Sequence, residues 1–261
     1  MEISAIIPLI LTYNEEPNLG RTLAQLTWAR EILVLDSGST DRTLALARSF
    51  PNVRILHRTF DSFAQQCNFG LTQIETEWVL SLDADYVLTD ELIEELQTLH
   101  PEPGTVGFSV AFRYCVFGRP LRGTLYPPRI VLYRRRLAVY GDDGHAHRVQ
   151  VRGSVRSLVG RMLHDDRKPL SHWVWSQDRY AKLEAEKLSR TPSAELGLND
   201  RIRKTILLGP PVVFLYTLFL KGVCLDGWAG WYYALQRALA ETLLSLRLIE
   251  ARLRKKSSPI D

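Results

Sequence analysis

The chain has 261 residues, 46% of them hydrophobic and 24% charged, and its formal net charge is +4. This composition excludes an intrinsically disordered protein, and the length suits one large domain or one domain with an appendage. Three widely spaced cysteines, Cys67, Cys115 and Cys224, argue against a disulfide framework and a Cys-x-x-Cys zinc site, and they favour a reducing, cytoplasmic compartment.

The first hundred residues alternate between strand and helix signals. Apolar runs predict strands at residues 3–8, 32–35, 53–56 and 78–82, with no signal peptide ahead of the first. Helical spacing predicts helices over 19–26, from a cap at Ser39 or Thr40 to about Ser49, over 63–74, and from a cap at Thr89 or Asp90 to 99. Such alternation predicts an α/β protein, with a mostly parallel sheet and helices on both faces.

Polar clusters follow three of the predicted strands. They lie at residues 12–16, 36–41 and 83–85. Ligands of parallel α/β sheets bind at the carboxyl ends of the strands, so we expect these clusters to form one site.

Residues 101–170 have a different pattern. Short strand-like pieces at 107–112, 130–133 and 149–151 predict a smaller mixed sheet, and residues 173–188 again have helical spacing.

The last sixty residues are basic and strongly apolar. Residues 201–261 hold ten Lys or Arg against four Asp or Glu, which predicts an acidic partner surface. An uncharged run at 205–220, an aromatic cluster at 228–233 and an amphipathic helix at 231–254 predict a segment that lies in a membrane interface. The alternatives are a helical hairpin packed on the protein's own core, or a dimer interface. Nucleic acid is not expected as a partner, because a nucleic-acid surface would interleave basic residues with exposed aromatics and would have no long apolar run.

Asp83 and Asp85 follow a buried strand directly. Paired carboxylates at this position can bind Mg²⁺ or Mn²⁺, which would bridge them to a diphosphate. The alternative is that they only cap a turn. Asp36 and Ser37 follow the predicted strand at 32–35, and they suit hydrogen bonds to a sugar hydroxyl or a base N–H.

These motifs together resemble a known family. The stretches are Thr12-Tyr13-Asn14-Glu15-Glu16, Val34 to Asp41, Asn68-Phe69-Gly70-Leu71 and Leu82-Asp83-Ala84-Asp85. Their order and spacing resemble the family 2 glycosyltransferases, and most of all the small bacterial enzymes that add sugars to lipopolysaccharide core and related glycolipids. The resemblance is strong over residues 3–100 and moderate over 101–190. It implies the Rossmann-like GT-A fold, here followed by a C-terminal amphipathic helical segment.

The resemblance also implies roles for individual residues. Asp36 would contact uracil or ribose, Asp83 ribose and metal, Asp85 metal, and Asn68 the nucleotide side. The other residues implied to bind the nucleotide-sugar are Thr12, Tyr13, Asn14, Glu16 and Ser37. The stretch 8–11 departs from the family pattern, because it lengthens the junction between the first strand and its loop.

The catalytic base is left open between two residues. An inverting transfer needs a group that takes the proton of the acceptor hydroxyl. Relatives often carry a Glu before a valine-rich strand, where this chain has Asp142-Asp143-Gly144-His145-Ala146-His147. We expect Asp143 to be the base, with His147 as the alternative. His164 is a candidate third metal ligand, since imidazole suits Mn²⁺, or else a packing histidine.

The sequence thus predicts a metal-dependent, inverting glycosyltransferase with three functional parts. Residues 1–100 would bind a nucleotide-diphosphate sugar, UDP-linked, 101–200 would hold the acceptor and the base, and 201–261 would bind the membrane. The acceptor would be an amphiphilic glycolipid or polysaccharide, and the enzyme peripheral on the inner face of the cytoplasmic membrane. The alternatives are an inactive nucleotide-sugar-binding protein of the same fold and a sugar-1-phosphate nucleotidyltransferase.

Overall fold

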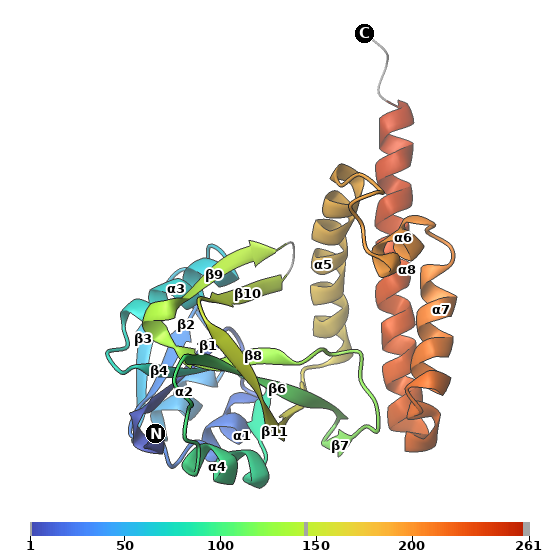
Figure 1. Ribbon diagram of the computed structural model, residues 1–261. Helices are drawn as coiled ribbons and strands as arrows, with labels where there is room; N and C mark the ends of the chain where they lie inside the picture. The colour runs from blue at the N-terminus through green and yellow to red at the C-terminus, as the bar shows by residue number, and fades with distance from the viewer. Residues whose placement is uncertain (1, 144–145, 258–261) are drawn as a thin grey trace. The chain divides into compact units, whose positions relative to one another are not determined.

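The computed structural model describes residues 2–143 and 146–257, and the side chains of 142–148 and 255–257 lie outside that description (Figure 1). The chain forms two compact units. Unit 1 comprises Met1–Pro120 and Tyr126–Lys168, and unit 2 comprises Leu121–Leu125 and Pro169–Asp261. The predicted three-part division concerns function, which this geometric division does not test.

Unit 1 is built on one mixed sheet. Its strands lie in the order β3 (Val53–His57), β2 (Ile32–Asp36), β1 (Ile6–Thr12), β4 (Trp78–Asp83), β8 (Arg129–Arg134), β6 (Thr105–Val116), β11 (Ser154–His164) and β5 (Tyr86–Leu88). The first four are parallel to one another, whereas β8 is antiparallel to both β4 and β6. β7 (Arg119–Pro120) pairs with β6, and β9 (Ala138–Asp143) pairs with β10 (Ala146–Val151) in a separate hairpin. The predicted α/β GT-A-type architecture is confirmed, with parallel pairing concentrated in its first half.

The prediction of a second, smaller sheet was wrong. The pieces at 107–112 and 130–133 belong to β6 and β8, which extend the main sheet beyond β4. Only residues 149–151 fall in the separate hairpin. β11 was missed, because its outward positions are exposed and no continuous apolar run marks it. Local sequence does not encode which distant strand a short segment pairs with.

Helices cover both faces of the sheet. On one face, α1 (Leu19–Ala24), α2 (Thr43–Arg48) and α4 (Asp90–Gln97) contribute to a core that includes Ile6 and Ile10 of β1. On the other, α3 (Phe63–Thr72) packs on Ile7 and Leu9. This division follows from the alternation of side chains along a strand. Gly70 lets α3 approach closely, since a Cβ there would lie 2.7 Å from a methyl carbon of Leu9.

Several predicted boundaries are corrected. β1 begins at Ile6 after a short 3₁₀ turn and runs to Thr12, so residues 8–11 are strand rather than a lengthened junction. Neither Ser39 nor Thr40 caps α2; Arg42 precedes it, and the carboxylate of Asp41 accepts the Thr43 N–H at 3.0 Å. The predicted cap of α4 is confirmed, because Thr89 Oγ1 accepts the Leu92 N–H.

Unit 2 is helical. It contains α5 (Leu170–Arg190), α6 (Leu198–Lys204), α7 (Gly209–Leu215) with a π-helical turn at Tyr216–Leu220, a 3₁₀ turn at Val223–Asp226, and α8 (Gly227–Ser257). Both α5 and α7 run alongside α8 (Figure 1). The core between α5, α8 and the segments on either side of α6 is formed by Ala181, Ala185, Leu188, Leu196, Ile206, Leu244 and Leu248.

The described helices were compared with what a membrane span requires. No single one of them is both long and apolar enough to cross a bilayer. By length and composition, one bent pair passes together, namely Gly209–Leu220 and Val223–Arg254, which meet at 70°.

Candidate functional site

The carboxyl ends of β1 and β2 meet in register. Thr12 lies opposite Asp36, and its Oγ1 donates a hydrogen bond to the Asp36 carboxylate at 3.2 Å. The Ser37 N–H donates to the carbonyl of Thr12 at 3.0 Å. Three residues predicted to bind the nucleotide-sugar are therefore in one place, because parallel strands end at the same edge.

Asp36 is completely buried. Its carboxylate accepts the N–H groups of Gly38 and Ser39, at 2.9 and 3.0 Å, and the Ser39 hydroxyl at 2.5 Å. These bonds fold the Ser37–Asp41 turn around the carboxylate. The predicted contact of Asp36 with uracil or ribose stays a prediction, and any such contact would add to this internal role.

The loop after β1 is joined to the same turn by hydrogen bonds. Asn14, held at a positive φ of 54°, donates its N–H to Ser39 Oγ at 2.9 Å and accepts the Thr40 N–H at 2.8 Å. Glu16 accepts the N–H of Arg42 at 3.2 Å. Tyr13, by contrast, is 49% exposed and extends into solvent beside these contacts. An exposed aromatic ring on a stiffened loop suits stacking on a base.

Asp83 and Asp85 lie at the end of β4, next to β1. Leu11 and Asp83 are paired residues of the parallel β1–β4 ladder. Asp85 follows in the turn to β5, and its Oδ2 lies 3.1 Å from His164 Nε2, at the end of β11. The structure thus brings Asp85 and His164, 79 residues apart, into direct contact.

His164 is enclosed by aromatic rings. Tyr86, Tyr114 and Tyr126 contact its ring edge-to-face, with centroids 5.3, 4.8 and 4.7 Å away. Burial alone would lower the pKa of His164, but the charge and hydrogen bond of Asp85, and then the charge of Asp83, raise it above its ordinary value.

Two polar atoms of this pair have no partner among the described residues. They are Asp85 Oδ1 and His164 Nδ1, and both are buried. Buried polar atoms are nearly always satisfied, so an unpartnered carboxylate oxygen beside a histidine suggests a ligand. No three His, Cys, Asp or Glu side chains among the described residues are grouped closely enough to hold a metal ion alone. The residues fit a cation that would take its remaining ligands from a diphosphate and water.

Only some of the side chains predicted near the catalytic base lie among the described residues. The Asn68 amide bonds the backbone of Tyr140 on β9, donating from Nδ2 at 3.0 Å and accepting at Oδ1 at 2.9 Å. Asn68 therefore anchors β9, and its predicted place on the nucleotide side stays a prediction. Asp143 and His147 lie on β9 and β10, but their side chains are outside the described residues.

Sequence reasoning missed a charged cluster behind Asp85. Lys168 Nζ donates to Glu15 Oε1 at 2.6 Å, and Asn18 donates to both Glu15 and Asp166, at 2.9 and 2.8 Å. Burial raises the pKa of Glu15 to about 7, against the opposing effect of Lys168. The pKa of Lys168 is raised to about 12, since the charges of Glu15 and Asp166 outweigh its burial. The charges of these residues are visible in the sequence, but only the tertiary structure brings Glu15 and Lys168 together.

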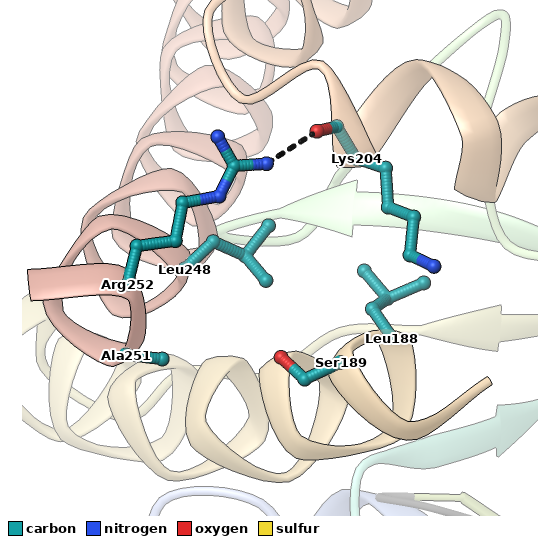
Figure 2. A pocket seen from close by; sticks show the side chains of 6 residues that line it. All are labelled: Leu188, Ser189, Lys204, Leu248, Ala251 and Arg252. Carbon is teal, nitrogen blue, oxygen red and sulfur yellow. Dashed lines mark hydrogen bonds between the residues drawn. The ribbon is translucent and has the colours of Figure 1, made fainter. Parts of the chain in front are cut away.

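A pocket of about 220 Å³ lies elsewhere, within unit 2 (Figure 2). It is bounded by α5, α6 and α8, and its lining residues are Leu188, Ser189, Lys204, Leu248, Ala251 and Arg252. None of the predicted site residues lines it. The Arg252 guanidinium donates to the backbone oxygen of Lys204 at 3.5 Å (Figure 2).

Comparison with known proteins indicates the family and the fold of the chain. The chain is 28% identical to the lipopolysaccharide core biosynthesis glycosyltransferase LpsC of Rhizobium meliloti (strain 1021), over 97% of this chain and 94% of that protein. It is 29% identical to the glycosyltransferase YibD of Escherichia coli (strain K12), over 38% of this chain and 30% of that one.

Among solved structures, the mannosyltransferase PcManGT from Pyrobaculum calidifontis, in complex with GDP-Man and Mn²⁺, superposes with a TM-score of 0.55 at 14% identity. The superposition covers 95% of this chain and 88% of that one, and it supports the GT-A fold. The profile of Glycosyl transferase family 2 matches residues 6–156, more than half of the chain. The chain therefore belongs to glycosyl transferase family 2.

Proposed function

We propose that the protein is a metal-dependent, inverting glycosyltransferase that moves a sugar from a nucleotide-diphosphate donor, UDP-linked, to an amphiphilic glycolipid or polysaccharide acceptor. One observation carries the proposal. Asp85 and His164 touch at the carboxyl end of β4, beside the loops that follow β1 and β2, and each has one buried ligand atom without a partner among the residues that the structure describes.

The chain's residues divide the work of such a transfer. Asp85 and His164 would hold the divalent cation, which supplies positive charge to a leaving diphosphate. The loops after β1 and β2 would bind the nucleoside. Asp143, or His147 in its place, would take the proton of the acceptor hydroxyl as its oxygen bonds to the anomeric carbon. The bond from that carbon to the diphosphate oxygen breaks at the opposite face, and its electron pair leaves with the diphosphate, so that the configuration inverts.

The relatives support the class of donor and acceptor. PcManGT was solved with GDP-Man and Mn²⁺, and LpsC is named for lipopolysaccharide core biosynthesis. A lipopolysaccharide core is attached to lipid, so its transferase works beside a membrane. We propose that this protein acts there too, from the cytoplasmic side of the inner leaflet.

The polar side chains of α8 support this placement, because several are turned inward. Glu241 is 7% exposed and accepts hydrogen bonds from Arg203 Nε and Nη2, at 3.0 and 2.7 Å. Arg247 binds Asp178 of α5 at 2.6 Å. Glu241 is thus buried in an ion pair, while Arg247 and Asp178 form a half-exposed ion pair within unit 2.

The apolar side chains of the same region face outward. Trp228 is 87% exposed and Leu220 74%. The other exposed apolar side chains in residues 207–253 are Leu207, Leu208, Val212, Leu215, Tyr216, Phe219, Leu225, Trp231, Leu235, Leu239, Leu246 and Leu253. Exposed apolar side chains in this number support an interaction site, and aromatic residues with flanking cations favour the lipid headgroup region. Part of the predicted apolar face, Leu243 and Ile249, packs instead on the core shared with α5.

Calorimetric titration with UDP and with GDP tests the donor site. Each is titrated with Mn²⁺ and with EDTA, into the wild type and into Asp85→Ala. Binding of UDP that needs Mn²⁺ and disappears in the variant supports the proposal, and preference for GDP would correct the donor. Failure of a folded protein to bind either diphosphate would contradict it. Transfer of sugar from the bound donor would then exclude an inactive binding protein of the same fold.

A further inference from the structure

We propose that Arg21 is a positioning residue, which holds Asp85 and His164 in the relative placement that binds the cation. This inference rests on the proposed metal dependence. Arg21 belongs to the six-residue helix α1 and contacts neither Asp85 nor His164 by a hydrogen bond that the structure describes. It acts through the residue that follows His164.

Arg21 binds both ends of Asp165. Its Nη1 donates to Asp165 Oδ2 at 2.7 Å, and its Nη2 donates to the Asp165 backbone oxygen at 2.7 Å. Nη2 also donates to Asn18 Oδ1 at 2.8 Å. A guanidinium has a rigid, planar set of donors, so three bonds of this kind fix the position and the orientation of the peptide that leaves His164.

Asp165 is itself tied to the other ligand. Its N–H donates to the carbonyl oxygen of Asp85 at 3.1 Å. On the far side of that strand end, Thr22 Oγ1 donates to the carbonyl of Ala84 at 2.7 Å. Two neighbouring residues of α1 therefore hold the two segments that carry the proposed ligands. Thr22 bonds Ala84, next to Asp85, and Arg21 bonds Asp165, next to His164.

The carboxylate of Asp165 is buried and is shared by two guanidinium groups, those of Arg21 and Arg167. Its side chain is 4% exposed, and it also accepts the Gly118 N–H at 2.9 Å and Arg167 Nε at 2.9 Å. A buried carboxylate that loses one of its two guanidinium partners moves toward water or toward the partner that remains, here Arg167. That movement would shift the Asp165 backbone and, with it, His164.

A role only in folding predicts something different. An arginine that merely stabilised α1 would lower the melting temperature when replaced and leave the cation affinity of the folded fraction unchanged. Partners that orient metal ligands change that affinity directly, by roughly 10–100-fold. The two roles therefore separate in a binding measurement made on folded protein.

The experiment measures the Kd of Mn²⁺ in the presence of UDP, from the EPR signal of the free ion. The variants are Arg21→Gln, which loses the positive charge, and Arg21→Lys, which keeps the charge but loses the planar set of guanidinium donors. Arg48→Gln, an exposed arginine of the six-residue helix α2, is the matched control. Asn52→Ala controls for lost stability, because it removes hydrogen bonds to the carbonyls of Leu26 and Ala29, outside the cluster.

We expect the Kd to rise about tenfold or more in Arg21→Gln, to rise less in Arg21→Lys, and to stay unchanged in both controls. A wild-type Kd in folded Arg21→Gln overturns the inference and leaves the proposed function intact. If Arg21→Gln does not fold, a wild-type Kd in Arg21→Lys overturns it equally. Absence of Mn²⁺ binding by the wild type itself would instead overturn the proposed metal dependence.

Discussion

The side-chain amide of Asn68 satisfies both backbone groups of Tyr140, with Nδ2 on the carbonyl at 3.0 Å and Oδ1 on the N–H at 2.9 Å. This relationship links α3, which lies within the part of the chain predicted to bind the nucleotide-sugar, to β9, the strand that leads to the proposed base Asp143. A residue predicted to contact the nucleotide thus anchors the β9–β10 hairpin at Tyr140.

Replacing Asn68 with Ala should therefore impair catalysis as well as stability. Two backbone groups of Tyr140 lose their partners, which costs about 1–3 kcal/mol of unfolding free energy. Asn52→Ala breaks two comparable bonds to backbone carbonyls away from the hairpin. Urea denaturation should show similar losses for both variants, whereas kcat should fall only in Asn68→Ala. Equal kcat values would mean that the bond to Tyr140 has no bearing on the reaction.

His164 should determine which cation the protein prefers. Imidazole nitrogen suits Mn²⁺ better than Mg²⁺, which favours oxygen ligands. We expect His164→Asn to weaken Mn²⁺ binding more than Mg²⁺ binding, by calorimetry with UDP present. His100→Asn, at an exposed position, should change neither. A parallel loss of both cations would argue that His164 only orients Asp85.

Glu15 should make stability depend on pH in a defined direction. Its pKa is raised by burial from 4.5 to about 7, so between these values the folded state holds a proton that the unfolded state has released. Its contribution to unfolding free energy is therefore fully present below about pH 4.5 and is lost as the pH rises to about 7. The wild type should lose stability relative to Glu15→Gln across this window, in urea denaturation at a series of pH values. The unfolding free energy of Glu75→Gln, a change at an exposed site, should vary with pH as that of the wild type does. The same variation in Glu15→Gln would refute the raised pKa of Glu15.

The apolar surface of unit 2 should bind lipid. Burying a large apolar side chain contributes about 1.5–3 kcal/mol, so the double change Trp228→Ser and Leu235→Ser should weaken binding to anionic vesicles on the order of 100-fold. Both side chains are exposed, so the fold should survive. Leu137→Ser with Val159→Ser, exposed apolar residues of unit 1, is the control for co-sedimentation. Retained binding with a change to monomer in solution would identify the surface as a dimer interface instead.

The first four strands and their helices could be predicted from sequence because their signals are local. Each strand of β1, β2 and β4 is an apolar run bounded by polar residues, and each following helix has apolar residues at helical spacing. Parallel strands joined by helices then bring Thr12, Asp36 and Asp83 to one edge as a consequence of topology. The family motifs gave the same residues.

The remainder depended on pairings between distant residues. No local signal placed β8 between β4 and β6, or β11 beside β5, and so none showed that His164 would reach Asp85. The same holds for α8. Its amphipathic period was evident from the sequence, but the side of the helix that packs on the rest of unit 2 was not. Glu241 and Arg247 of α8 form ion pairs with Arg203 and Asp178 on that side.

The amino-acid sequence alone therefore determined the α/β class, the family and the edge of the sheet that carries the site, since these follow from hydrophobic period and from motif order. The tertiary structure alone decided which polar side chains already have hydrogen-bond partners and which keep an atom that could bind a ligand. Asp36 and Asn68 are largely occupied by backbone groups, Arg21 and Lys168 by buried carboxylates, while Asp85 and His164 each keep a buried atom without a partner in the described structure. That distinction depends on distances of a few ångströms between segments far apart in the chain, which no local pattern encodes.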